Sequence, residues 1–214
     1  MTRRTFDQYC PIARALEVVG ERWSLLIVRE LLLGPRRYTD LRQALPRMWT
    51  NLLADRLRHL ERAGVIESVD LPPPAARTVY RLTERGRGLE PVILGLGLWG
   101  IPLLAGRRKK DPPLSTSVLL GLRAFFQPTA AAHTEERYEV RIRGEPFTAV
   151  VQQGRLEVRS GQPDSPAATL LADPAGLLDV RFGRIDVEAA IENGVLRFHG
   201  SEASVRRLRR ALAL

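Results

Sequence analysis

Hydrophobic residues in the first half of the chain recur at helical spacing in two successive segments. Tyr38 to Leu45 predicts a short helix, which ends before Pro46. Thr50 to Ala63 predicts a longer helix, which ends at Gly64. The pattern therefore predicts two helices joined by a tight break.

β-Branched and aromatic residues dominate the two short runs that follow. Val65 to Leu71 and Thr78 to Leu82 predict two strands, joined by a loop that begins with three prolines at 72–74. Two further helices are expected earlier in the chain, from Cys10 to Val19 and from Glu21 to Leu33. Helix, turn, helix and a two-stranded hairpin follow one another in this order in a winged helix-turn-helix, which is the predicted fold of the region.

The longer helix has one apolar and one polar face. Leu53, Leu57 and Leu60 recur at spacings of four and three residues, which predicts that they are buried. A polar opposite face is either simply solvated, as in most amphipathic helices, or enters the major groove of DNA; the flanking elements favour the groove. The residues expected to contact DNA are Thr50, Asn51, Ala54, Asp55 and Arg58 on this helix, with Arg36, Arg37 and Arg77 at phosphates.

The positive charge of the chain is concentrated in the same half. Residues 1–110 hold 20 Lys and Arg and 11 Asp and Glu, a net charge of +9, whereas residues 111–214 hold 13 of each and are neutral. An arginine-rich composition can follow from a GC-rich genome, but such a bias would act on both halves. The asymmetry therefore favours phosphate binding by the first half.

The residues after 114 predict an α+β domain with a small, mainly antiparallel sheet. Strands are expected over Tyr138 to Ile142, Phe147 to Gln153, Leu156 to Val158, Ala168 to Ala172 and Leu196 to Phe198. Helices are expected over Leu114 to Phe126, Asp173 to Phe182, Val187 to Ile191 and Glu202 to Leu214. His133 and His199 have no His or Cys at metal-ligand spacing, and no phosphate loop or nucleophile elbow occurs, so neither an enzyme nor a metal or cofactor is expected.

Cysteine content and hydropathy bear on where the chain works. Its single cysteine, Cys10, excludes an intramolecular disulfide framework. The first residues lack the apolar core of a secretory signal. The most apolar run, Val92 to Ala105, is shorter than the roughly 20 residues that span a bilayer. A cytoplasmic protein that does not enter membranes is therefore expected.

Five segments, taken in order, resemble the HxlR-type branch of MarR-like winged-helix regulators. They are Cys10 to Leu16, Gly20 to Leu31, Gly34 to Leu41, Arg56 to Ile66 and Tyr80 to Gly86, and the resemblance covers about residues 8–104. Membership implies a homodimeric, sequence-specific transcription factor that binds double-stranded DNA. It also implies that the helix after the wing joins its mate across the dimer axis.

Three positions of this resemblance carry open alternatives. Trp49 stands where the family usually has a small hydroxyl residue, so that either Thr50 takes over as N-cap or Trp49 packs against the DNA backbone or the protein. The glycine-rich segment Glu90 to Ala105 is still expected to be helical, because its apolar surface can be buried against a partner chain. Cys10 is either a thiol sensor, as in some members of the family, with Arg14 supplying positive charge, or a small residue at the start of a helix.

The second half is similar to sterol carrier protein-like domains in its turns and apolar spacing. The segments that carry the similarity include Gly144 to Phe147, Gly154 to Leu156, Ala167 to Leu170, Phe182 to Arg184 and Asn193 to Gly200. The resemblance implies a hydrophobic tunnel that holds a lipid-like molecule, a site that needs an apolar lining. The residues expected to line it, or else simply to fill a core, are Phe125, Phe126, Leu178, Phe182, Ile191 and Phe198.

The expected organisation is a DNA-binding and dimerisation domain at 1–105, a basic linker at 106–114 that ends in prolines, and a sterol carrier protein-like domain at 115–214. The expected function is that of a homodimeric regulator on a near-palindromic operator, whose second domain senses a hydrophobic small molecule. The alternative is a carrier of lipids or hydrophobic ligands in which the winged helix serves mainly for dimerisation.

Overall fold

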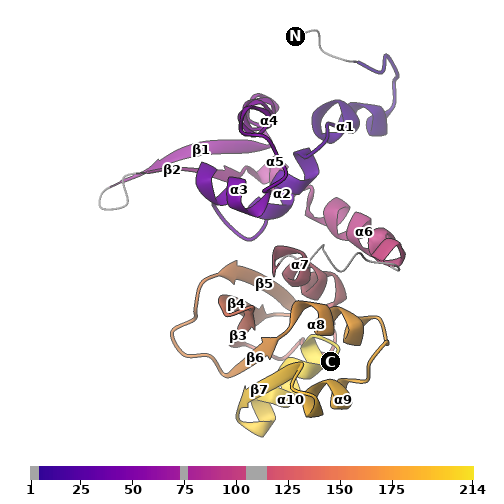
Figure 1. Ribbon diagram of the computed structural model, residues 1–214, viewed down its shortest axis with the longest axis vertical. Coiled ribbons are helices and arrows are strands. Elements are labelled where there is room, and N and C mark those ends of the chain that lie inside the picture. The colour runs from indigo at the N-terminus through magenta and orange to yellow at the C-terminus, as the bar shows by residue number, and fades with distance from the viewer. Residues whose placement is uncertain (1–4, 73–76, 105–114) are drawn as a thin grey trace. The chain divides into compact units, whose positions relative to one another are not determined.

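The chain consists of two compact units. The computed structural model describes residues 5–72, 77–104 and 115–214 (Figure 1). Contacts between Cα atoms divide the chain into Met1–Ile93 and Leu94–Leu214. The expected linker, 106–114, and the expected boundary at 105 lie outside the described residues.

Four helices open the first unit: α1 (Pro11–Val19), α2 (Ser24–Leu31), α3 (Tyr38–Ala44) and α4 (Thr50–Arg62). The expected start of α2 at Glu21 is wrong by three residues. Trp23, the N-cap of α2, has a φ of 81° in the left-handed region, so the helical backbone cannot extend back through it. The turn between α1 and α2 is therefore longer than the hydrophobic pattern predicted.

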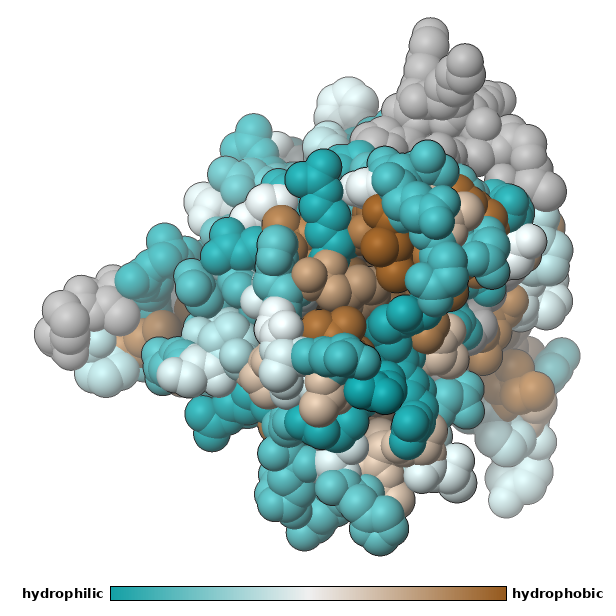
Figure 2. All heavy atoms as spheres, turned by 90° about the horizontal axis from the view of Figure 1, so that it is seen from below, coloured by the Kyte–Doolittle hydropathy of each residue, from teal (hydrophilic) through white to brown (hydrophobic). Residues whose placement is uncertain are grey.

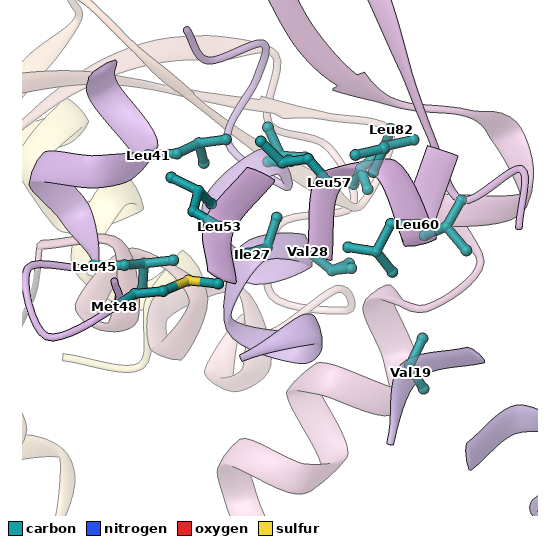
Figure 3. Packing of buried hydrophobic residues seen from close by; sticks show 13 residues of the cluster. Val19, Ile27, Val28, Leu41, Leu45, Met48, Leu53, Leu57, Leu60 and Leu82 are labelled. Carbon is teal, nitrogen blue, oxygen red and sulfur yellow. The ribbon is translucent and has the colours of Figure 1, made fainter. Parts of the chain in front are cut away.

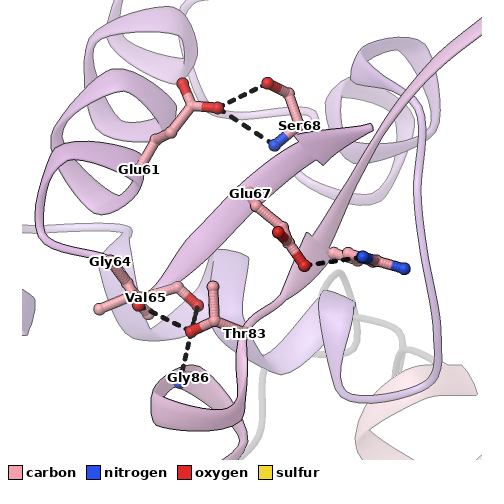
Figure 4. A network of polar contacts seen from close by, with 8 residues as sticks. Glu61, Gly64, Val65, Glu67, Ser68, Thr83 and Gly86 are labelled. Atoms are coloured by element: carbon pink, nitrogen blue, oxygen red, sulfur yellow. Dashed lines mark hydrogen bonds and ion pairs between the residues drawn. The ribbon is translucent and has the colours of Figure 1, made fainter. Parts of the chain in front are cut away.

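A two-stranded antiparallel hairpin follows, formed by β1 (Ile66–Leu71) and β2 (Arg77–Leu82). Gly64 turns the chain from α4 into β1 at a φ of 67°, a value that favours glycine. Glu61 on α4 accepts hydrogen bonds from the backbone N and the hydroxyl of Ser68, at 3.1 Å and 2.6 Å (Figure 4). The hairpin is therefore fixed to α4 by polar contacts as well as by the turn.

A buried hydrophobic cluster holds the first unit together. Leu53, Leu57 and Leu60 of α4 are at most 2% exposed and lie in one buried cluster with Ile27 and Val28 of α2 (Figure 3). The expected burial of the three leucines is thus confirmed, and so is the winged helix-turn-helix.

Two helices continue from the hairpin: α5 (Glu84–Arg87) and α6 (Glu90–Gly100), followed by the 3-10 helix η1 (Ile101–Leu104). Thr83 caps α5: its hydroxyl accepts from the backbone N of Gly86 and donates to the carbonyl of Gly64 (Figure 4). The expected helix over the glycine-rich segment is also confirmed up to Gly100. None of the residues of α6 is buried.

The second unit is an α+β fold, as predicted. It contains α7 (Ser115–Phe125), α8 (Pro174–Arg181), α9 (Val187–Glu192) and α10 (Glu202–Ala211). Its strands are β3 (Glu136–Ile142), β4 (Glu145–Gln152), β5 (Arg155–Ser160), β6 (Ala168–Ala172) and β7 (Leu196–Gly200), in the order β5-β4-β3-β6-β7. Only the β3–β6 pair of this sheet is parallel, and α10 contacts β6 and β7. The centre of the unit is filled by side chains such as Leu119, Tyr138, Leu170 and Leu177, each at most 1% exposed.

Candidate nucleic-acid interface

The residues of the expected DNA-binding face on α4 differ in their exposure to solvent. Thr50, Asn51 and Arg58 are exposed, whereas Ala54 and Asp55 are half-buried. All five lie on α4, the helix whose opposite side is anchored in the core by Leu53, Leu57 and Leu60. The face therefore stands on a rigid element, which a surface that reads base edges requires.

Two residues of this face bind each other. The Arg58 guanidinium forms an ion pair with the Asp55 carboxylate one helical turn earlier, and its Nε also donates to the carbonyl of Ala54 at 3.4 Å. The Arg58 side chain remains 70% exposed. Because a guanidinium has five N–H donors, Arg58 can keep Asp55 and still offer donors to a base or a phosphate.

Three polar contacts from other elements fix the position of α4. The Tyr38 hydroxyl donates to the carbonyl of Thr50 at 2.9 Å, which ties the first turn of α4 to α3. Arg56 donates to Glu21 and to the carbonyl of Arg22, at 2.9 Å and 3.3 Å. His59 Nε2 lies 3.0 Å from the carbonyl of Val18, at the end of α1. The hydrophobic spacing of α4 gave no sign that these side chains hold the helix in place.

The three arginines expected at phosphates lie in different settings. Arg36 forms an isolated β-bridge with Tyr80, with N–O distances of 2.9 Å and 2.8 Å, so its backbone is fixed to β2. Arg37 is exposed at the N-cap of α3, where its backbone N donates to Asp40 at 2.9 Å. Arg77 is the first residue of β2, pairs with Leu71 and is half-buried. Arg37 is the most exposed of the three.

Trp49 resolves two of the alternatives left open by the sequence. Trp49, and not Thr50, is the N-cap of α4, so the expected transfer of the cap to Thr50 is wrong. Its side chain is 82% exposed, so it does not pack against the protein, and packing against the DNA backbone stays a prediction. The residue stands beside Thr50 and Asn51 at the start of the exposed face.

Cys10 lies just before α1 and is partly exposed. The charge that Arg14 was expected to supply is paired with Glu17, at 3.0 Å. The pKa of the Glu17 carboxyl is held below its usual value by the hydrogen bond from the Phe6 backbone and by that from Arg14. Arg14 is therefore already neutralised by a carboxylate, which weakens its support for a thiolate.

The expected ligand residues of the second unit are half-buried. This holds for Phe126, Leu178, Phe182, Ile191 and Phe198, while the side chain of Phe125 lies outside the described residues. Two of the rings are covered by guanidinium groups: Arg184 lies 5.2 Å from the ring centre of Phe182, and Arg209 lies 6.0 Å from that of Phe198. These two rings thus lie near charged groups at the surface.

A hollow elsewhere in this unit is lined by both polar and apolar side chains. It is bordered by Glu135, Glu136, Arg137, Val150, Val151 and Gln152, which include none of the expected ligand residues. In the face that Figure 2 shows, atoms of hydrophobic residues gather near the middle, with atoms of hydrophilic residues around them. Among the described residues no helix is long and apolar enough to cross a membrane, and no group of three or more His, Cys, Asp or Glu could hold a metal ion.

A partly buried polar network that sequence reasoning missed joins the sheet to α10. Glu136 accepts two hydrogen bonds from Arg207 at 2.5 Å and 3.0 Å, and a third from the hydroxyl of the buried Tyr138. The bonds from Arg207 hold the pKa of the Glu136 carboxyl below its usual value, and burial raises the pKa of the Tyr138 hydroxyl. Glu136 and Tyr138 lie two residues apart on β3, whereas Arg207 lies on α10, so the packing of α10 against the sheet brings the three side chains together.

Comparison with protein families gives one match for each unit. The model described as HxlR-like helix-turn-helix matches residues 18–106, and the model described as the SCP-2 sterol transfer family matches residues 125–213. Both resemblances that the sequence indicated are therefore confirmed.

Curated relatives match mainly the first half. The chain is 33% identical over 94 residues to the uncharacterised HTH-type transcriptional regulator YvaP of Bacillus subtilis, covering 44% of this chain and 87% of YvaP. It is 39% identical over 140 residues to the uncharacterised HTH-type regulator Rv3095 of Mycobacterium tuberculosis, covering 64% of this chain and 80% of that protein. For the regulator sll1512 of Synechocystis the values are 40% over 87 residues, 41% of this chain and 64% of the relative.

Solved structures also match the first half. The reduced form of the transcriptional regulator YodB from Bacillus subtilis is 29% identical, with a TM-score of 0.41, and the match covers 47% of this chain and all of that one (100%). The transcription factor PA1607 is 33% identical, with a TM-score of 0.44, and covers 50% of this chain and 73% of its own.

Proposed function

Because this chain belongs to the HxlR-like helix-turn-helix family of transcriptional regulators and is fused to an SCP-2 sterol transfer domain, we propose that it is a homodimeric repressor or activator that binds a near-palindromic operator and responds to a hydrophobic small molecule. The α4 surface lies in the major groove and reads base edges. The wing and the exposed Arg37 contact phosphates.

The observation that carries this proposal is the two-sided character of α4. One side is locked into the core by three leucines that are at most 2% exposed, and the other presents Asn51 and Arg58 to solvent. An asparagine can bind adenine through two hydrogen bonds, and an arginine can bind guanine in the same way. The concentration of the whole net charge of +9 in residues 1–110 supports the same surface, because phosphate contacts supply most of the affinity for DNA.

Exposed apolar side chains support the homodimer. Val92, Leu96 and Trp99 recur along α6 at spacings of four and three residues and are 54%, 48% and 70% exposed. On α1, Ile12 and Leu16 are 71% and 44% exposed. A row of large apolar residues along one side of a helix marks a protein-binding surface, and a second copy of the chain is the partner that a near-palindromic operator requires.

The match to the SCP-2 sterol transfer family supports a hydrophobic effector for the second unit. Such a molecule changes DNA binding only if its affinity differs between the DNA-bound and the DNA-free state. The same match favours a second candidate function, a carrier of hydrophobic ligands whose winged helix only dimerises. The two functions differ in one respect: a carrier binds lipid and has no preferred duplex.

The test is a selection of genomic duplexes with the purified full chain, followed by titration of the best duplex at several salt concentrations. A regulator yields one near-palindromic site, and its affinity falls steeply as salt rises. The selection is repeated with lipid extract present, and an effector shifts the affinity for the selected site. Absence of binding to any duplex at low salt, with a copurified lipid in native mass spectrometry, supports the carrier instead.

A further inference from the structure

In the described part of α3, α4 and the wing, Trp49 is the one exposed large hydrophobic residue. Its side chain is 82% exposed, and within the described residues 27–72 and 77–91 no other large hydrophobic side chain is fully exposed. The other exposed large hydrophobic residues of the described chain lie near the N-terminus, on α1 and α2, and on α6 and η1. Trp49 therefore needs a reason of its own.

The local structure does not supply that reason. Trp49 is the N-cap of α4, a position that usually holds a side chain able to accept a hydrogen bond from the first turn. An indole has an N–H donor and no acceptor, and Trp49 makes no capping bond with its side chain. Neither capping nor burial explains a tryptophan here, and exposing so large an apolar surface to water is unfavourable.

The backbone on both sides of Trp49 is held in place. Met48 before it is buried at 6% exposure, and its backbone N donates to the carbonyl of Leu45 at 2.9 Å. The carbonyl of Thr50 after it accepts from the Tyr38 hydroxyl at 2.9 Å. The carbonyl of Trp49 itself accepts from the backbone N of Leu53 at 3.0 Å. The indole is thus presented from a fixed point, two residues before the exposed Asn51.

An apolar ring at this point has one specific partner in the major groove. Base edges there offer hydrogen-bond donors and acceptors, and the thymine 5-methyl group is their only apolar feature. In helix-turn-helix proteins the first residues of the recognition helix approach base edges. We infer that Trp49 packs its indole against the methyl group of one thymine in each half-site and is a specificity-determining residue. This inference rests on the proposed function of α4 as the DNA-reading helix.

The test compares thymine with deoxyuridine, which lacks only the methyl group. In the duplex selected by the wild-type chain, each thymine of a half-site is replaced in turn by deoxyuridine, and binding is measured for wild type and for Trp49→Ala. We expect one position at which wild type loses about fourfold in affinity, the value for one buried methyl group, while Trp49→Ala loses nothing. Trp49→Phe keeps an apolar ring and should retain the dependence on that methyl group.

The other outcomes distinguish failure of the proposed function from failure of the role assigned to Trp49. If wild type selects no duplex, the proposed function itself fails. If wild type binds a selected duplex but the deoxyuridine scan is the same for wild type and Trp49→Ala, only the role of Trp49 is overturned. Uniformly weaker binding of Trp49→Ala to all duplexes, without dependence on any methyl group, indicates contact with the DNA backbone and also overturns it. Because the side chain is exposed, the thermal midpoint of Trp49→Ala should stay near that of wild type, and Trp49→Gln serves as a second variant without an aromatic ring.

Discussion

At the scale of single residues, Arg58 on the exposed face of α4 already contacts other residues of the same helix. Arg58 forms an ion pair with Asp55. The pair is exposed, so its own contribution to stability is small. In the proposed function the pair acts in recognition, because Asp55 holds the guanidinium close to the surface of the helix in a defined orientation.

Arg58 and Arg37 are expected to differ in what they contribute to binding. In the proposed function Arg58 reads a base, so its replacement by Ala should cost about 1–3 kcal/mol on the selected operator and relax the preference at one position. The exposed Arg37 is assigned to a phosphate in the same proposal, so its replacement by Ala should weaken all duplexes alike and lower the salt slope by about 1. Fluorescence anisotropy with operator and mutated duplexes measures both. Equal loss on all duplexes from Arg58→Ala contradicts its assignment as a base-reading residue.

Glu136 gives the second unit a stability that depends on pH. The hydrogen bonds from Arg207 lower the pKa of the Glu136 carboxyl in the folded chain below its ordinary value of 4.5. A lowered folded pKa stabilises the fold above the unfolded pKa, and this stability is lost as pH falls through the folded pKa. Glu136→Gln should therefore be less stable than wild type at about pH 7, and the difference should shrink below about pH 4.5.

Urea unfolding followed by circular dichroism measures this difference. The matched control is Glu202→Gln on α10, because Glu202 is also paired with an arginine, Arg206, but both side chains are exposed, at 89% and 64%. Its effect should be small at every pH. A stability difference for Glu136→Gln that does not change between about pH 7 and about pH 4 shows that the effect of Glu136 is not electrostatic.

At the scale of elements, the connection from α4 through the wing to α5 depends on a close backbone approach. Gly86 lies where an added Cβ atom would come within 2.0 Å of the carbonyl oxygen of Val65. Thr83 joins the same two segments, because its hydroxyl donates to the carbonyl of Gly64 and accepts from the backbone N of Gly86 (Figure 4). The turn after α4 and the start of α5 are therefore packed directly against each other.

Gly86→Ala should destabilise the first unit by more than about 2 kcal/mol, because the atom that clashes belongs to the backbone and cannot move away by rotation. Gly88→Ala is the matched control, since its Cβ would lie 3.2 Å from the carbonyl oxygen of Arg85 and needs only a small shift. Thermal unfolding monitored by circular dichroism compares the two variants. Similar midpoints for both would show that the α4–α5 connection can relax.

The elements themselves follow closely from hydrophobic spacing, and the exceptions have local causes. The burial of Leu53, Leu57 and Leu60 and the hairpin after Gly64 could be predicted, because periodicity and turn residues determine both. The start of α2 could not, because the left-handed backbone of Trp23 leaves no mark in a hydrophobic pattern. The same limit applies to the candidate site: spacing identified the exposed face of α4, while the Asp55–Arg58 pair and the exposure of Trp49 depend on side-chain conformation.

At the scale of the whole molecule, the stability of the glycine-rich helix α6 depends on what its exposed side contacts. Gly95, Gly97 and Gly100 each cost a helix about 1 kcal/mol relative to Ala, and none of the residues of α6 is buried. Leu89, just before α6, and Ile93 in its first turn pack on the core of the first unit, while Val92, Leu96 and Trp99 remain exposed. A helix with this composition gains stability mainly from tertiary packing, which for its exposed side can come only from another surface.

Operator binding and self-association should therefore fail together when this exposed side is charged. Leu96→Glu places a carboxylate in the middle of the apolar row, where dimerisation would bury it without a partner, so the dimer should weaken at least about tenfold.

Sedimentation velocity over a range of protein concentrations measures dimerisation, and titration of the selected duplex measures binding. Gln162→Glu adds the same charge at an exposed position of the second unit and should change neither. In the proposed function each half-site is read by one α4. A monomer then loses the joint contribution of two half-sites, and its affinity should approach that for unrelated DNA. A Leu96→Glu chain that is monomeric and still binds the full operator as tightly as wild type would show that α6 does not couple dimerisation to DNA recognition.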